Sequence, residues 1–154
     1  MKTAYANTVA VVTGAGSGLG WALAHALARR GASLALVDCN AAGLEAVVEA
    51  LAPFGVQVST HCLDITDCAR VAALPQEVIA RHGRVSWLVN NAGVALLGRF
   101  DEVDPAEAAW VLEVNALGTM RMTSAFLPHL LQEERAHLVN ISSMLGLGAV
   151  PGAA

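Results

Sequence analysis

The chain has 154 residues and a net charge of −4, and 55% of its residues are hydrophobic. This length suits one domain over residues 1–154, and the lack of any basic run longer than Arg29-Arg30 argues against a nucleic-acid partner. Because no stretch of about 18 apolar residues is present and the N-terminus lacks the apolar segment of a signal peptide, we expect no membrane partner and a cytoplasmic location.

The first predicted strand leads directly into a glycine-rich turn. Residues 9–12 are apolar and mostly β-branched, as is typical of a buried strand. Residues 13–20 read Thr-Gly-Ala-Gly-Ser-Gly-Leu-Gly, and residues 19–30 then repeat small and apolar side chains at helical spacing. This order predicts a strand, a tight turn and a helix that begins at the turn.

The turn has the chemistry of a phosphate-binding site. Gly14 permits the sharp turn, Gly18 lets phosphates approach the main chain, and Gly20 lets the helix pack closely on the strand. The free N–H groups at the start of a helix attract anions, and Ser17 can donate its hydroxyl. Because many loops contain glycines for conformational reasons alone, the interpretation depends on the residues downstream of the turn.

The second and third predicted strands each end at an aspartate. Residues 33–37 run into Asp38 and residues 56–63 run into Asp64, with a helix predicted between them at 41–52. Asp38 lies beyond the glycine turn at the spacing where a carboxylate binds the adenosine ribose and repels the 2′-phosphate of NADP. The alternative for both aspartates is that they only begin a turn.

The third helix and the fourth strand come next. Asp67 is predicted to cap a helix that runs to residue 81, and Pro75 should kink that helix or split it into two pieces. Residues 85–89 form the fourth predicted strand. This strand runs into a polar loop that begins Asn90-Asn91-Ala92-Gly93.

The last predicted elements are one long helix and one strand. Asp104, Pro105 and Glu107 have the arrangement of a capping box, which begins a helix that extends to about residue 131. Residues 138–141 form the fifth strand, and Ser142-Ser143 comes directly after it.

Strands that alternate with helices predict an α/β fold, a doubly wound parallel sheet of the Rossmann type with right-handed crossovers. The natural strand order is 3-2-1-4-5, which places the glycine turn and residues 90–93 on either side of the switch point between the first and fourth strands. The cysteines show no Cys-x-x-Cys spacing and the histidines are scattered singly, so we expect no metal site.

Taken together, the motifs resemble those of the short-chain dehydrogenase/reductase family, which carries TGxxxGxG at the turn and Asn-Asn-Ala-Gly after the fourth strand. The resemblance extends over the whole chain and implies an oxidoreductase that moves a hydride between NAD and a small alcohol or ketone substrate. NAD is favoured over NADP because no arginine stands beside Asp38 or in the turn. The cofactor-binding residues that the resemblance implies are Gly14, Ser17, Gly18, Leu19, Gly20, Asp38, Asp64, Ile65, Asn91, Ala92 and Gly93. Among them, Asp64 would accept the adenine amino group and the backbone of Ile65 would contact the adenine ring.

The resemblance also implies two catalytic residues. Asn115, inside the long helix, would hold a water that relays protons, and Ser143 would hydrogen-bond the substrate oxygen. Taken in isolation, Asn115 would be interpreted as a mild helix defect and Ser143 as a turn residue at a strand end.

The family's proton-transfer motif, Tyr-x-x-x-Lys beyond the serine, is missing from the chain. The only tyrosine is Tyr5 and the only lysine is Lys2. We therefore expect a truncated N-terminal part of such an enzyme, incomplete at the C-terminal side of the sheet and inactive alone, whose complete form assembles as a homo-oligomer through the long helix. The alternative is a non-catalytic dinucleotide-binding or partner-binding protein.

Overall fold

The computed structural model of the chain describes residues 5–99, 101–144 and 148. Its strands form a parallel sheet in the order β3-β2-β1-β4-β5, which confirms the predicted fold class and strand order. Along the chain the elements are β1 (Val9–Thr13), α1 (Gly18–Ala28), β2 (Ser33–Asp38), α2 (Ala41–Leu51), η1 (Ala52–Phe54), β3 (Val58–Cys62), α3 (Cys68–His82), β4 (Trp87–Asn90), α4 (Pro105–Leu112), η2 (Glu113–Gly118), α5 (Thr119–Leu130) and β5 (His137–Asn140).

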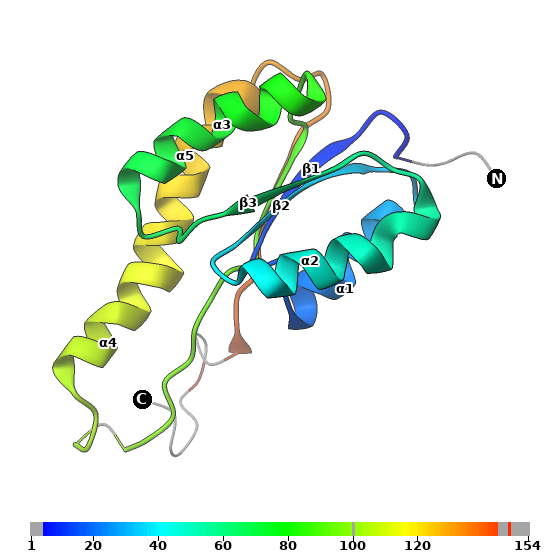
Figure 1. The fold of residues 1–154 in the computed structure, drawn as a ribbon. Coiled ribbons are helices and arrows are strands. Elements are labelled where there is room, and N and C mark those ends of the chain that lie inside the picture. Colours follow the sequence, from blue (N-terminus) through cyan, green and yellow to red (C-terminus); the bar gives the residue numbers. More distant parts are fainter. Residues whose placement is uncertain (1–4, 100, 145–147, 149–154) are drawn as a thin grey trace.

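Helices cover both faces of the sheet (Figure 1). On the face of α1 and α2, Val47 shares a core with Val12 of β1. On the opposite face, Leu74 of α3 and Phe126 of α5 share a second core with Val11. Because successive side chains of a strand point to opposite faces, a strand between two helical layers must be apolar throughout, and every residue of β1 is buried.

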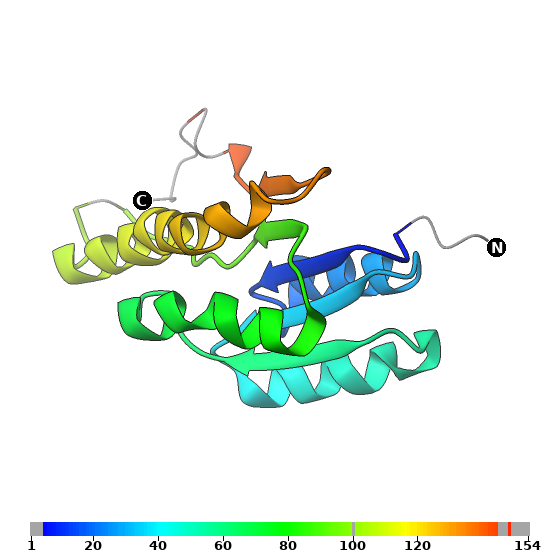
Figure 2. The ribbon, with the colours of Figure 1, turned by 90° about the horizontal axis from the view of Figure 1, so that it is seen from above.

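The strands step across the sheet from β5, in orange, to β3 at the other edge (Figure 2). Thr13, the last residue of β1, stands beside Val37 near the end of β2. Parallel pairing thus brings the loops after β1, β2 and β4 to one edge of the sheet, which is where ligands bind in open α/β folds.

The long helix predicted from residue 105 is divided. α4 and α5 are joined by η2, a π-helical segment. A π segment holds more residues per turn than an α-helix and is frequent at functional sites. Sequence periodicity does not predict it, because one widened turn hardly changes the pattern of apolar residues.

Of the two outcomes predicted for Pro75, a kink or a split of the helix, the split does not occur. α3 runs without interruption through Pro75. A proline inside a helix removes one backbone hydrogen bond, but Pro75 is buried beside Leu74 and Val78. Apolar burial of this part of the helix offsets the lost bond.

β5 is an edge strand with little cover. Leu138 is 41% exposed and only Val139 is partly buried. An apolar groove of about 210 Å³ runs between this strand and α1, with Leu23, Val139 and Ile141 among its walls. The sheet therefore has an uncovered apolar face on this side.

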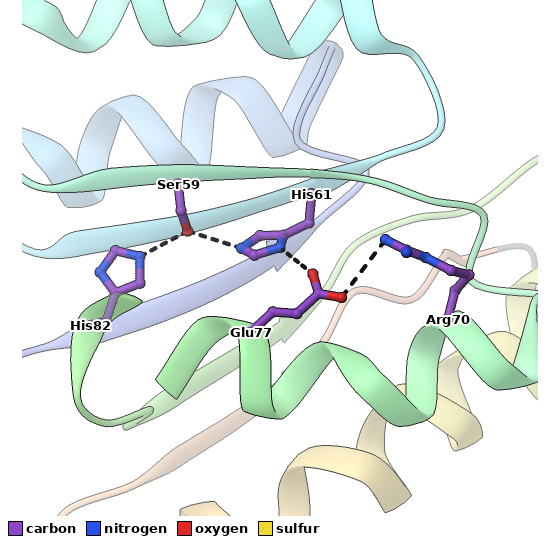
Figure 3. A network of polar contacts seen from close by, with 5 residues as sticks. All are labelled: Ser59, His61, Arg70, Glu77 and His82. Atoms are coloured by element: carbon purple, nitrogen blue, oxygen red, sulfur yellow. Dashed lines mark hydrogen bonds and ion pairs between the residues drawn. The ribbon is translucent and has the colours of Figure 1, made fainter. Parts of the chain in front are cut away.

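At the opposite edge, a polar network joins β3 to α3 (Figure 3). Ser59 Oγ lies 2.9 Å from His61 Nε2 and 2.8 Å from His82 Nε2. Glu77 Oε2 lies 3.2 Å from His61 Nδ1, and Arg70 approaches the other carboxylate oxygen at 3.8 Å. The network holds the strand whose end leads into the candidate site.

Candidate functional site

A cavity of about 390 Å³ lies beyond the carboxyl ends of β1, β2, β3 and β4. Loops after all four strands and the α4–η2 segment form its walls. Every predicted cofactor-binding residue except Gly20 is among the lining residues, which are Gly14, Ser17, Gly18, Leu19, Val37, Asp38, Cys39, Leu63, Asp64, Ile65, Asn91, Ala92, Gly93, Val94, Trp110 and Val114.

The glycine turn needs its glycines for two different reasons. Gly14 has a φ of 63° and Gly18 a φ of 52°, a region that other residues rarely adopt. A β-carbon on Gly20 would stand 2.0 Å from the carbonyl oxygen of Gly14, so only glycine lets α1 begin this close to β1. Nothing lies within 4 Å of a β-carbon placed on Gly18. The turn is therefore tight on its inner side and open at Gly18.

The start of α1 leaves polar groups available to a ligand. Ser17 is the N-cap residue, yet its side chain makes no capping hydrogen bond. Ser17 and Leu19 are exposed and line the cavity. N–H groups in the first turn of a helix have no partner within the helix, so this end of α1 suits a phosphate group.

The carboxylate of Asp38 is held by two backbone N–H groups. Gly16 donates to Oδ2 at 2.8 Å and Asn40 donates to Oδ1 at 2.9 Å. A β-carbon on Gly16 would stand 3.0 Å from Cγ of Asp38, so the turn and the carboxylate are closely packed here. Asp38 thus has a defined orientation at the cavity wall.

The end of the cavity near Asp38 is electronegative. Burial and the negative charges of Asp38 and Asp64 raise the pKa of the Cys39 thiol above its usual value. In the described part of the chain, no lysine or arginine lines the cavity. The site therefore favours hydrogen-bond donors, such as hydroxyl groups, over a further anion at this end.

Asp64 has both of the properties weighed for it from the sequence. Its Oδ1 accepts a hydrogen bond from the N–H of Thr66 at 2.8 Å, as a turn-initiating aspartate does. The exposed side chain also lines the cavity. The next residue, Ile65, is only 6% exposed and forms an apolar part of the wall.

The loop after β4 is tied to the glycine turn. Thr13 Oγ1 accepts hydrogen bonds from the N–H groups of Asn91 at 3.0 Å and Ala92 at 2.9 Å. The side-chain amide of Asn91 donates in return to the carbonyl oxygens of Thr13 at 3.0 Å and Gly14 at 3.2 Å. Thr13 was not predicted as a site residue, although its hydroxyl group directly before the turn was the available signal.

Asn90 faces the other way and holds β5. Its side-chain amide donates to Thr123 Oγ1 of α5 at 3.0 Å and to Asn140 Oδ1 at 2.9 Å. Asn140 is the last residue of β5 and the register partner of Asn90. This link fixes the strand end from which the chain continues to Ser143.

Asn115 lies in η2 and pairs with a single residue of the loop after β4. Its Oδ1 accepts from the N–H of Val94 at 2.8 Å, and its Nδ2 donates to the carbonyl oxygen of Val94 at 2.8 Å. The side chain therefore clamps this loop to the π segment. Its assignment to a proton-relaying water remains a prediction.

Ser143 stands in the exposed segment after β5 and is not among the residues that line the cavity. Several lining residues were not predicted, among them Trp110 and Val114 of the α4–η2 segment and Val94. No local pattern marks Trp110, because its position at the cavity depends on how the segment crosses the ends of the strands.

Tyr5 lies near the amino end of β4, opposite to the end at which the cavity lies. Its ring centroid lies 5.2 Å from that of Trp87, the first residue of β4. The cavity lies beyond Asn90, the last residue of the same strand. Tyr5 therefore does not reach the cavity as a proton donor.

The described part of the chain holds neither a metal-binding cluster nor a membrane-spanning helix. Within residues 5–99, 101–144 and 148, no group of three or more His, Cys, Asp or Glu side chains could hold a metal ion. None of the helices in the same ranges is both long and apolar enough to cross a membrane.

Known proteins share the sequence pattern and this geometry. Residues 8–154 match the family described as short chain dehydrogenase. SadH of Mycobacterium tuberculosis is 40% identical over 150 residues, which cover 97% of this chain and 54% of that protein.

Two solved structures are also similar. A short-chain dehydrogenase/reductase from Burkholderia phymatum in complex with NAD has a TM-score of 0.91 and 36% identity, covering 99% of this chain and 54% of that one. A metagenomic short-chain oxidoreductase in complex with NADP has a TM-score of 0.90 and 35% identity, covering 98% of this chain and 69% of that one. The chain spans about half the length of the curated relatives it matches. The chain belongs to the short-chain dehydrogenase family.

Proposed function

We propose that this chain binds NAD(H) and forms the cofactor half of an oxidoreductase that interconverts a small alcohol and a ketone. The observation that carries the proposal is the Asp38 carboxylate, fixed by the N–H groups of Gly16 and Asn40 at the wall of a cavity that begins at a helix N-terminus. A fixed carboxylate binds ribose hydroxyls, and the helix start receives the pyrophosphate. Bound NAD supplies the hydride acceptor, and NADH the donor.

The choice of NAD over NADP rests on charge. A 2′-phosphate placed beside Asp38 would meet a carboxylate with no lysine or arginine among the described lining residues to neutralise it. Relatives of known structure include proteins in complex with either cofactor, so the family alone does not decide the matter. The local charge is what supports NAD.

The roles of the two catalytic candidates are part of the proposal. Ser143 hydrogen-bonds the substrate oxygen, and Asn115 orders the loop at Val94 and a water for proton relay. The described residues offer no tyrosine at the cavity, since Tyr5 packs on Trp87 at the amino end of β4. The proton donor is therefore expected from outside the described residues, and residues 1–154 alone should bind NADH without turnover.

We propose further that the complete protein is a homo-oligomer. The α4–α5 segment exposes large apolar side chains, among them Leu112 at 64% and Met120 at 63%. A second copy of the chain could cover them. Size-exclusion chromatography with light scattering tests this, and we expect an oligomeric wild type that Met120→Glu dissociates. A monomeric wild type, unchanged by Met120→Glu, would contradict the proposal.

The alternative is a protein that binds a dinucleotide or a partner without catalysis. Two measurements separate the possibilities. Titration with NADH, followed by the fluorescence of the nicotinamide, should show saturable binding to the protein as its gene encodes it, and a panel of secondary alcohols with NAD should yield NADH. Binding without turnover of any alcohol or ketone would favour the non-catalytic dinucleotide-binding protein. Absence of NADH binding would reject the oxidoreductase and leave only a partner-binding protein.

A further inference from the structure

Gly118, the last residue of η2, is buried directly against Ile65 of the cavity wall. A β-carbon placed on Gly118 would stand 2.6 Å from Cδ1 of Ile65 and 2.8 Å from Cγ1. Carbon atoms in contact are ordinarily separated by about 3.5 to 4.0 Å. Any side chain larger than hydrogen at this position therefore displaces Ile65.

The direction of that displacement is set by the packing around Ile65. On its protein side, Ile65 shares a core cluster with the buried residues Val71, Leu74 and Met122, none of which lines the cavity. Protein interiors are close-packed and offer little room for a shifted side chain. The cavity is the open side, so a displaced Ile65 moves into the space that a ligand would occupy.

The same segment meets the cavity at two other points. Val114, one turn before Gly118, is 7% exposed and lines the cavity. Asn115 clamps Val94, another lining residue. η2 thus supports the wall formed by Ile65 at one place and the loop after β4 at another.

We infer that Gly118 is a positioning residue of the cofactor site. Because it has no side chain, Ile65 can pack against η2 instead of extending into the cavity, and this sets the width of the slot, the part of the cavity lined by Asp64 and Ile65. The inference rests on the proposed NAD site, in which this slot takes the adenine ring. Gly118 does not touch the ligand. It acts through Ile65 alone, which makes the pair accessible to a double-mutant cycle.

A purely structural role predicts something different for this position. Alanine has a higher helix propensity than glycine, so Gly118→Ala should leave the unfolding temperature unchanged or raised if Ile65 yields into the cavity. If the glycine were needed only for folding, the variant would lose stability, and binding of every ligand would fall together.

The test measures binding to the protein as its gene encodes it. The ligands are NADH, AMP as the adenine half of the cofactor, and reduced nicotinamide mononucleotide as the other half. We expect Gly118→Ala to raise the Kd of NADH and AMP by about fivefold or more and that of the mononucleotide by less than about twofold. Ala116→Ser, which adds one atom at an exposed position of the same segment, is the matched control and should change none of them.

The cycle is completed with Ile65→Ala, which removes both atoms that a Gly118 methyl group would meet, and with the milder Ile65→Val. In the Ile65→Ala background, Gly118→Ala should change the Kd of AMP by less than about twofold. An unchanged Kd of AMP in the single variant, or an equal loss in both backgrounds, would overturn the inference. Failure of the wild type to bind NADH would instead reject the proposed function.

Discussion

The carboxylate of Asp38 accepts a hydrogen bond from the backbone N–H of Gly16 at 2.8 Å, so the end of β2 and the glycine turn hold each other in place. The last residue of β2 and a residue of the turn after β1 therefore define the proposed ribose site. A β-carbon at position 16 would stand 3.0 Å from Cγ of Asp38, so a larger residue there would press on the carboxylate.

Replacing Asp38 should change the choice of cofactor. Asp38→Ala removes the ribose acceptor and the charge that repels a 2′-phosphate, so the ratio of NADP to NAD dissociation constants should fall by about tenfold or more. Asp38→Asn keeps an accepting oxygen, so its ratio of NADP to NAD dissociation constants should lie between those of the wild type and Asp38→Ala. Competition titrations with NADH measure both constants, and an unaltered ratio in Asp38→Ala would exclude the ribose assignment.

Gly20→Ala should damage both the fold and the site. The added methyl group would stand 2.0 Å from the carbonyl oxygen of Gly14, and such overpacking typically costs about 1 to 3 kcal/mol. Urea unfolding and NADH titration should both report a loss. Gly148→Ala is the matched control because a β-carbon at Gly148 meets nothing within 4 Å. Equal behaviour of the two variants would contradict the predicted clash.

Thr13→Val should loosen the loop after β4 while keeping the shape of the side chain. The N–H groups of Asn91 and Ala92 both lose their acceptor. A buried donor left unpaired costs about 1 to 3 kcal/mol, and since these two groups are only partly buried, we expect a loss near the lower end of that range. Thr13→Ser retains the oxygen and should keep most of the stability. Chemical unfolding of the two variants checks the prediction, which fails if serine is as destabilising as valine.

His82 should make stability depend on pH through the network of Figure 3. Burial, together with the neighbouring His61 and Arg81, lowers the pKa of His82 below its usual value, and its buried Nδ1 has no hydrogen-bond partner. Below about pH 6.5 the unfolded chain thus binds a proton that the folded chain resists, so stability falls as the pH falls.

The loss should stay below about 1 kcal/mol, because the ring is partly exposed and its charge is screened by solvent. His82→Gln keeps an N–H donor for Ser59 but does not titrate, and it should remove this part of the acid destabilisation. Unfolding free energies measured on both sides of the transition provide the check. A wild type and variant that lose stability in parallel would refute the assignment to His82.

The order of elements, the parallel sheet and most of the proposed cofactor site were predictable because they depend on local patterns. Apolar runs, glycine spacing and aspartates at strand ends reflect backbone conformation and burial, which neighbouring residues in the chain determine. Asp38 and the glycine turn could be paired from the sequence alone, since parallel strands bring their carboxyl ends to one edge.

The features that remained hidden depend on packing between distant segments. Thr13 accepts hydrogen bonds from loop residues that are 78 and 79 positions away in the sequence. Asn115 binds Val94, which is 21 positions away. The side chain of Ile65 occupies the space that a side chain at Gly118 would need. The π segment that places Asn115 and Gly118 leaves almost no trace in the periodicity. The sequence by itself determined the order of strands and helices and predicted the cofactor-binding residues at the strand ends. Only the tertiary structure decided which side chains contact one another there, because those contacts depend on how the helices pack on the sheet.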